Sequence, residues 1–205
     1  MSQDLFADNT PGEVINIAGA QLLFFPQVQL PIAHDEVLAR LIAQVPWVQE
    51  DIIIYGKRHP QPRLIAWYGD EGMNYRYSGV THYPLPWSSI LLELKHKVEA
   101  LCGCSFNSAL VNYYRHERDS MGMHSDDERE LGPQPVIASL SLGGPRTLIF
   151  KPKRGGARFT LALPPGSLLV MQGDTQKNWL HGINKETTPC APRVNITFRR
   201  IIQAD

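Results

Sequence analysis

The sequence lacks the features of a secreted, membrane-spanning or strongly charged protein. Only three of its 205 residues are cysteine, without paired CxxC spacing, so we predict no disulfide framework and expect a reducing compartment. No apolar run approaches the roughly 18 residues that cross a membrane. The N-terminus also lacks the basic and apolar regions of a secretory signal. We therefore expect a cytoplasmic location without membrane contact.

The sequence also has no excess of charge of either sign. It contains 20 Lys and Arg residues and 20 Asp and Glu residues, which gives a net charge of zero and a pI of about 7.1. Overall electrostatics therefore does not indicate a nucleic-acid partner, and any such contact must come from local clusters. Basic residues gather at 57–63, 115–118 and 151–158, although each cluster would also be ordinary on a solvated surface.

The length predicts one domain. Residues 1–20 mix polar residues with Pro11 and Gly12, and we expect them to form a flexible N-terminal tail. Within this tail, Gln3 to Phe6 is a weak candidate for a partner-docking motif. Residues 21–205 are expected to form the single folded domain, which we expect to be monomeric.

Two predicted helices precede a region of short strands. Apolar residues recur at helical spacing over 37–45 and 90–101, and the helix breakers Pro46 and Gly103 follow these segments. From Phe106 onward, short apolar runs alternate with turn residues, which predicts strands at 109–114, 136–142, 147–151, 158–163, 168–171 and 194–201. The pattern predicts an α+β protein with a double-stranded β-helix (jelly-roll) core backed by N-terminal helices.

Residue types that bind metals occur as His124-Ser125-Asp126 and as a distant His181. In an extended strand, side chains two residues apart share a face, so His124 and Asp126 can reach one ion. Two imidazoles and one carboxylate leave other coordination positions open, which suits Fe(II) that binds a co-substrate and dioxygen. Zinc accepts the same ligands and stays open as an alternative, although no HExxH helix or paired CxxC favours it. Solvated or core histidines are a further alternative.

A strand with one polar face begins twelve residues after His181. Its polar residues alternate with apolar ones and are Arg193, Asn195, Thr197 and Arg199. The polar side chains therefore share a face, which we expect to point into the barrel. Two arginines buried beside a metal need an anionic partner, and a small dicarboxylate would supply it. Arginines of an edge strand that pair with surface acids are the alternative.

With these motifs the chain resembles the AlkB family of iron- and 2-oxoglutarate-dependent nucleic-acid dealkylases, over about Leu22 to Ile201. The resemblance rests on blocks at Asn112-Tyr113-Tyr114, His124 to Glu128, Val136 to Leu142, Gly166 to Leu169, His181 and Pro192 to Arg199. Within this family, the chain is most similar to the branch that repairs duplex DNA. The resemblance implies that His124, Asp126 and His181 hold Fe(II) and that 2-oxoglutarate is bound by Asn112, Tyr114, Arg193, Asn195, Thr197 and Arg199. Arg193 would pair with the distal carboxylate, and Arg199 would lie near the metal-proximal one.

The resemblance also implies a substrate-recognition lid at about 50–87. Residues 52–57 indicate a strand and a tight turn, with Gly56 and Lys57, that presents Tyr55. Tyr55 is our candidate for an aromatic wedge that enters the base stack when a damaged nucleotide is flipped out, although an ordinary surface tyrosine is the alternative. Family members often have phenylalanine in place of this residue and of Tyr77.

Four further residues of this chain would contact the substrate if the resemblance holds. Tyr77 would stack on the flipped base, and stacking on an aromatic side chain contributes about 1–3 kcal/mol per base. Tyr75 and Asp127 would address the polar edges of that base. Arg63 would contact a phosphate of the alkylated DNA.

The implied function is oxidative DNA dealkylation by a dioxygenase. It would remove N-methyl groups from bases such as N1-methyladenine and N3-methylcytosine, in single- or double-stranded DNA, with release of formaldehyde and succinate. Two alternatives stay open, namely the same oxygenase chemistry on RNA or protein and a non-catalytic nucleic-acid-binding module. A module without turnover would not need three metal ligands and two arginines, which argues against the second alternative.

Overall fold

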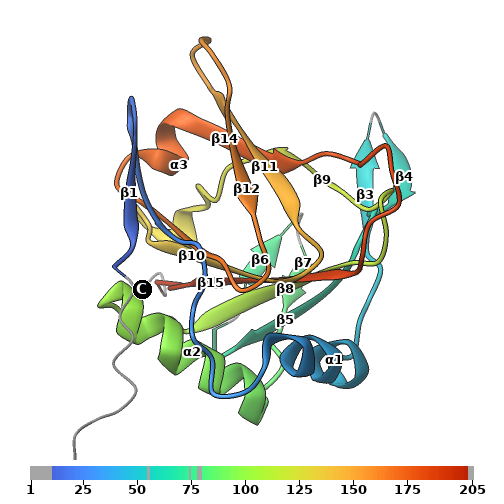
Figure 1. Ribbon diagram of the computed structural model, residues 1–205. Coiled ribbons are helices and arrows are strands. Elements are labelled where there is room, and N and C mark those ends of the chain that lie inside the picture. Colours follow the sequence, from blue (N-terminus) through green and yellow to red (C-terminus); the bar gives the residue numbers. More distant parts are fainter. Residues whose placement is uncertain (1–10, 55, 74, 78–79, 203–205) are drawn as a thin grey trace, which may run out of the picture.

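The computed structural model of the protein describes residues 11–54, 56–73, 75–77 and 80–202. Two antiparallel sheets face each other, and two helices cover the outer face of the larger sheet (Figure 1). These helices are α1, His34–Gln44, and α2, Ser89–Cys102, and a short helix α3, Thr175–Asn178, precedes strand β14. The arrangement confirms the predicted α+β class with a jelly-roll core.

The larger sheet has seven strands in the order β1-β2-β13-β10-β15-β8-β5. They are β1 Glu13–Ile17, β2 Ala20–Phe25, β13 Leu168–Gln172, β10 Ile137–Gly143, β15 Arg193–Arg199, β8 Ser108–Tyr114 and β5 Leu64–Gly69. All neighbours are antiparallel. Because strands far apart in sequence are neighbours, residues from both ends of the chain meet in this sheet.

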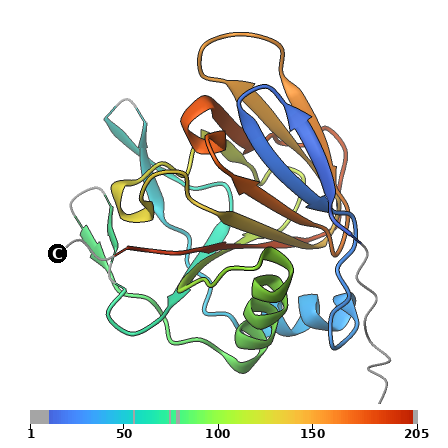
Figure 2. The ribbon, with the colours of Figure 1, turned by 90° about the vertical axis from the view of Figure 1, so that its left-hand side faces the viewer.

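The smaller sheet has the order β12-β11-β14-β9. Its strands are β12 Phe159–Leu163, β11 Arg146–Pro152, β14 Trp179–Ile183 and β9 Met121–His124. Outside the two sheets lie a 3-10 turn, Arg129–Leu131, and the hairpins β3–β4, Asp51–Ile54 and Lys57–Pro60, and β6–β7, Tyr75–Tyr77 and Val80–His82. Both hairpins belong to the predicted lid, and Figure 2 shows them projecting on the same side of the molecule.

The larger sheet separates two hydrophobic cores. The first lies between this sheet and the helices, where Leu41 of α1 and Leu94 of α2 join strand residues such as Ile196. The second lies between the two sheets and includes Ile137 and Phe150. Since side chains alternate along a strand, each central strand of the larger sheet presents one face to each core. Polar residues on the inner face therefore point toward the space between the sheets.

The two long helices end within one residue of the positions that the sequence predicts, whereas α1 begins at His34, three residues before the predicted segment. Val45, which precedes Pro46, has extended backbone angles, because a following proline disfavours the helical conformation. Helix α2 is capped by Gly103, which has a left-handed φ of 65° that is unfavourable for a residue with a side chain. Among the described residues, no helix is long and apolar enough to cross a membrane.

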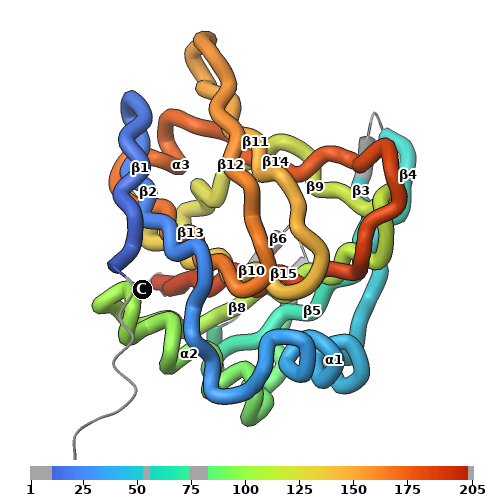
Figure 3. The backbone as a smooth tube through the Cα atoms, in the orientation of Figure 1, coloured from blue at the N-terminus to red at the C-terminus, as the bar shows by residue number. Residues whose placement is uncertain are grey.

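The predicted flexible tail is wrong for the segment from residue 13 to residue 20. Strand β1 and the turn at 18–19 lead into β2, which pairs with β13 inside the larger sheet. Figure 3 shows this hairpin at the edge of the fold, beside β13. The prediction failed because β1 is short and mostly exposed, so its composition resembles that of a tail. Residues 1–10, with the candidate motif Gln3 to Phe6, lie outside the described residues.

Candidate active site

Three potential metal ligands meet where β9 and β14 pair. His124 ends β9, and His181 lies directly opposite it in β14. The ligand atoms of these histidines and of Asp126 all lie within 4.8 Å of one another. The spacing of His124 and Asp126 predicts that both lie on one continuous strand, but the strand ends at His124. The loop that follows brings the Asp126 carboxylate to within 3.6 Å of His181 Nε2.

The hydrogen bond of His124 and the electrostatics of Asp126 and His181 suit metal binding. His124 Nδ1 lies 2.9 Å from the carbonyl oxygen of Gly122; a carbonyl only accepts, so Nδ1 donates and Nε2 is left as a ligand atom. Burial, followed by the neighbouring His124, lowers the pKa of His181 to about 3. Burial opposes ionisation of Asp126, but Arg199 and the two imidazoles outweigh it and lower the pKa of this carboxyl. Neutral imidazoles and an ionised carboxylate are the forms that bind metals.

Two buried atoms of the cluster, Asp126 Oδ2 and His181 Nδ1, have no hydrogen-bond partner among the described residues. A buried carboxylate oxygen normally has a partner, and a cation held by the two imidazoles would provide one. Nitrogen and carboxylate ligands without a thiolate suit Fe(II) better than structural zinc. The residues present therefore fit a divalent metal of the iron type.

A buried guanidinium faces the same space. Arg193, at the start of β15, is 1% exposed, and its Nη2 donates to Ser141 Oγ at 2.9 Å. Its Cζ lies 5.0 Å from the centre of the Tyr114 ring, whereas its Nε and Nη1 have no hydrogen-bond partner among the described residues. Burial lowers the pKa of Arg193, and burying an unpaired cation is unfavourable by several kcal/mol. A bound carboxylate would remove that penalty.

The other polar side chains of β15 continue the lining of this space. Arg199 Nη2 donates to Asp126 Oδ1, which holds a positive charge beside the candidate metal ligands. Thr197 Oγ1 donates to Asn195 Oδ1 at 3.1 Å, and Asn195 Nδ2 donates to Ser139 Oγ at 2.8 Å. These bonds fix the orientation of the Asn195 amide, since its oxygen accepts and its nitrogen donates.

These residues line one pocket together with others that sequence reasoning missed. The predicted site residues in its wall are Tyr114, His124, Asp126, His181, Arg193, Asn195, Thr197 and Arg199. The missed residues are Met121, Ser139, Leu148, Leu163, Met171, Gly182 and Ile183. Ser139, which with Ser141 interrupts the apolar residues of β10, was a usable signal, because a buried hydroxyl needs a partner. The apolar residues gave no signal that separates them from ordinary core residues.

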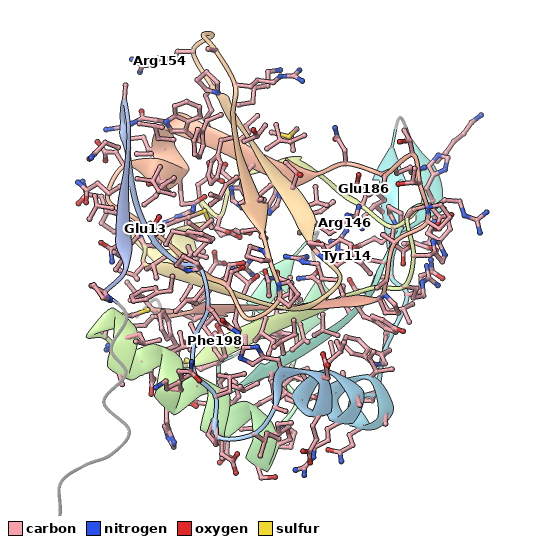
Figure 4. All side chains as sticks on the ribbon, in the orientation of Figure 1. Glu13, Tyr114, Arg146, Arg154, Glu186 and Phe198 are labelled. Carbon is pink, nitrogen blue, oxygen red and sulfur yellow. The ribbon has the colours of Figure 1, made fainter. Side chains whose placement is uncertain are left out.

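Arg146, the first residue of β11, is a further buried residue that was not predicted from the sequence. This guanidinium is 3% exposed, and its Cζ lies 5.6 Å from the centre of the Tyr114 ring (Figure 4). Its Nε donates to Glu186 Oε1 at 3.1 Å, and its Nη2 donates to the carbonyl oxygens of Asp119 and Asn184. Arg146 therefore ties the loop before β9 to the loop after β14, the two strands with the candidate histidines.

Three predicted site residues form side-chain hydrogen bonds outside the pocket. Arg63 Nε donates to Asn112 Oδ1 at 2.8 Å, and neither side chain is among the described residues that line the pocket. Asp127 Oδ2 accepts from Lys153 Nζ at 2.8 Å. The structure thus holds Arg63 against the barrel wall and pairs Asp127 with the β11–β12 connection. Their predicted contacts with co-substrate, phosphate and base stay predictions.

The described part of the lid includes only some of the predicted substrate contacts. Gly56 has a φ of 76° in the turn between β3 and β4, and the exposed Lys57 begins β4. Tyr55 lies outside the described residues. The side chains of Tyr75 and Tyr77 do so as well, although their backbone forms β6. The wedge and stacking roles therefore also stay predictions.

Comparison with known proteins adds independent findings. The family model described as the 2OG-Fe(II) oxygenase superfamily matches residues 21–199. The chain is 45% identical over 177 residues to the "Alpha-ketoglutarate-dependent dioxygenase alkB homolog 3" of Rattus norvegicus, covering 82% of this chain and 59% of that protein. It is 38% identical over 179 residues to the "DNA oxidative demethylase ALKBH2" of Homo sapiens, covering 82% and 69% respectively.

The chain spans about three fifths of the length of the alkB homolog 3 proteins that it matches. A solved structure described as "The structure of OsALKBH1" is similar, with a TM-score of 0.63 and 15% identity. The alignment covers 93% of this chain and 100% of that one. At this identity the likeness supports the fold, and the metal and anion sites rest on the geometry described above.

Proposed function

The chain belongs to the 2OG-Fe(II) oxygenase superfamily, and from this premise we propose that it is an oxidative dealkylase of alkylated nucleic acids, with methylated DNA bases as substrates. One observation carries the proposal: the buried cluster of His124, Asp126 and His181 shares a pocket with the Arg193 guanidinium, whose Nε and Nη1 have no hydrogen-bond partner among the described residues. A metal and a dicarboxylate would satisfy both. Such a pair of sites has no evident use in a non-catalytic module.

In this proposal each inner residue has a separate task. His124, Asp126 and His181 would hold Fe(II), and three protein ligands would leave coordination positions for the co-substrates. When bound, Fe(II) with 2-oxoglutarate and dioxygen supplies the oxidation that hydroxylates an N-linked methyl carbon, with release of succinate and carbon dioxide. The resulting hydroxymethyl adduct loses formaldehyde and leaves the repaired base.

The co-substrate would lie along β15. Arg193 takes the distal carboxylate through its unpaired N–H groups, because hydrogen bonds from a guanidinium to a carboxylate are charge-assisted and strong. Arg199 lies beside the metal ligands and would be next to the proximal carboxylate. Asn195 and Thr197 line the path between them. Tyr114 supports the Arg193 guanidinium with its ring, while Asn112 would act from the neighbouring strand β8.

The lid, at about 50–87, would select the nucleic acid. Its hairpin β3–β4 is well exposed along Lys57–Pro60, which suits a segment that contacts a large substrate. Tyr55 would enter the base stack, Tyr77 would stack on the flipped base, and Tyr75 and Asp127 would address its edges. The sugar-phosphate backbone of the nucleic acid would be contacted by Gly56, Lys57 and Arg63. A relative named as a DNA oxidative demethylase supports DNA as the substrate.

The test is mass spectrometry of oligonucleotides that carry N1-methyladenine or N3-methylcytosine. Single- and double-stranded DNA and single-stranded RNA are incubated with the protein, Fe(II), ascorbate and 2-oxoglutarate. We expect loss of the methyl group that depends on 2-oxoglutarate and disappears in Asp126→Ala. His96→Ala is the matched control, because His96 lies on the exposed face of α2.

Each other outcome has a definite meaning. Demethylation of RNA alone would move the substrate class from DNA to RNA. Succinate production without demethylation of any oligonucleotide would refute the nucleic-acid substrate while retaining the oxygenase. Failure of folded, metal-loaded protein to form either product would refute the proposal. A monomer in a reducing cytoplasm completes the proposal, and its three free cysteines fit such a compartment.

A further inference from the structure

A buried glutamine outside the candidate site holds the loop that carries the carboxylate ligand. Gln176, in helix α3, is 2% exposed, and its Oε1 accepts a hydrogen bond of 2.9 Å from the backbone N–H of Asp126. At its other end, Nε2 lies 3.5 Å from Met171 Sδ, in the wall of the pocket. The amide thereby spans from the pocket wall to the loop after β9, and both of its ends are occupied.

Helix α3 is itself held by the N-terminal hairpin. Asn178 Nδ2 donates to the carbonyl oxygen of Gly19 at 2.9 Å, and Trp179 Nε1 donates to that of Ala18 at 3.0 Å. The backbone N–H of Gln21 donates to Thr175 Oγ1 at 2.9 Å. Figures 1 and 2 both show α3 beside the hairpin β1–β2. One short helix thus links the turn at 18–19 to the loop of Asp126.

This linkage matters because Asp126 lies beyond the end of β9. A strand would fix its backbone through ladder hydrogen bonds, but the loop residues 125–128 have none. Arg199 forms an ion pair with the Asp126 carboxylate and so attracts this side chain. The hydrogen bond from Gln176 fixes the backbone from which that carboxylate projects. Groups that orient metal ligands typically change metal affinity by about 10- to 100-fold when removed.

We propose that Gln176 is a positioning residue for Asp126, and that the N-terminal hairpin supports it through α3. The inference rests on the proposed function, because it assumes that Asp126 holds a metal. It predicts that the hairpin, which lies partly before the residues matched by the family model, tunes the metal affinity of this chain. Gln176 touches neither metal nor substrate and acts through Asp126.

The test is titration with Mn(II), followed by the electron paramagnetic resonance signal of the free ion. Gln176→Met keeps the length of the side chain but replaces the amide acceptor with a weakly accepting thioether, and we expect Mn(II) binding to weaken about tenfold or more. Gln176→Glu retains an acceptor oxygen at the same reach and should restore native affinity. Lys177→Ala, on the exposed side of the same helix, is the matched control and should bind as the native protein does.

A second variant tests the hairpin and covers the case in which Gln176→Met does not fold. Thr175→Val combined with Asn178→Ala removes two side-chain anchors of α3 and leaves Gln176 intact. We expect weaker Mn(II) binding than in the native protein, with circular dichroism confirming the fold. Native affinity in a folded Gln176→Met protein, or in this double variant, would overturn the inference.

The same titration separates this inference from the proposed function. The native protein must bind Mn(II), and His181→Ala must abolish that binding. If the native protein fails to bind, the metal site and the inference fall together. If the native protein binds and demethylates while the Gln176 variants bind equally well, the inference alone falls.

Discussion

Arg193→Met should have opposite effects on the ligand-free protein and on co-substrate binding. The Arg193 guanidinium is 1% exposed, and two of its nitrogens have no partner among the described residues. Replacing buried ionic groups with apolar side chains of similar volume is often neutral or stabilises by about 1–4 kcal/mol. Against that gain stand the lost hydrogen bond to Ser141 and the lost contact with the Tyr114 ring. We therefore expect the ligand-free variant to be as stable as the native protein, or slightly more stable.

The co-substrate should lose much of its affinity in this variant. Truncating one partner of a buried, hydrogen-bonded charge pair costs about 2–5 kcal/mol, and 2.7 kcal/mol corresponds to about 100-fold in affinity. At a ligand concentration of about 100 times the native dissociation constant, 2-oxoglutarate stabilises the native protein by about 2.7 kcal/mol. The same concentration would stabilise the variant by only about 0.4 kcal/mol.

The assay is thermal unfolding with Mn(II) in place of iron, with and without 2-oxoglutarate. For a chain of this size, 1 kcal/mol shifts Tm by about 2–4 °C, so the native protein should gain about 5–10 °C and the variant about 1 °C. Arg158→Met, at an exposed position, should behave like the native protein. If Arg193→Met lowers the Tm of the ligand-free protein by several degrees but keeps the full Tm increase on adding 2-oxoglutarate, Arg193 is structural and does not bind the dicarboxylate.

Three further predictions concern the metal ligands and the lid. His124→Ala should abolish demethylation with little change in circular dichroism, and substantial residual turnover would contradict its role as a ligand. Tyr55→Ala should impair repair of duplex more than of single-stranded DNA, because only the duplex stack has to be opened; equal losses would remove the wedge role. The metal-free protein should lose stability as pH falls from about 6.5 toward 3. The pKa of His181 is about 6.5 in the unfolded chain but about 3 in the folded protein. Between these values the free energy of unfolding therefore falls with decreasing pH by at most about 1.4 kcal/mol per pH unit. Urea unfolding of His181→Ala should show a shallower dependence, and an identical slope would refute this assignment.

The sequence predicted those helices and strands whose side chains show a regular alternation of polar and apolar residues. The alternation of polar and apolar residues over 193–199 identified β15 and its inner face, because a strand with one face in each environment requires that period. The helical spacing before Pro46 and Gly103 identified α1 and α2 for the same kind of reason. Strands β1 and β9 were harder to predict, since they are short and largely exposed.

The sequence by itself determined which chemical groups are available for the site: two imidazoles, carboxylates and a polar strand with two arginines. Only the tertiary structure decided which of them meet. It brought Asp126 to His181 from a loop, placed Asn112 in a hydrogen bond with Arg63, and buried Arg146 beside Tyr114. Sequence periodicity describes a residue's own strand or helix, whereas these contacts depend on segments that lie dozens of residues apart and become neighbours when the two sheets pack. The hydrogen bond between Gln176 and Asp126, which are 50 residues apart, likewise depends on the packing of distant segments.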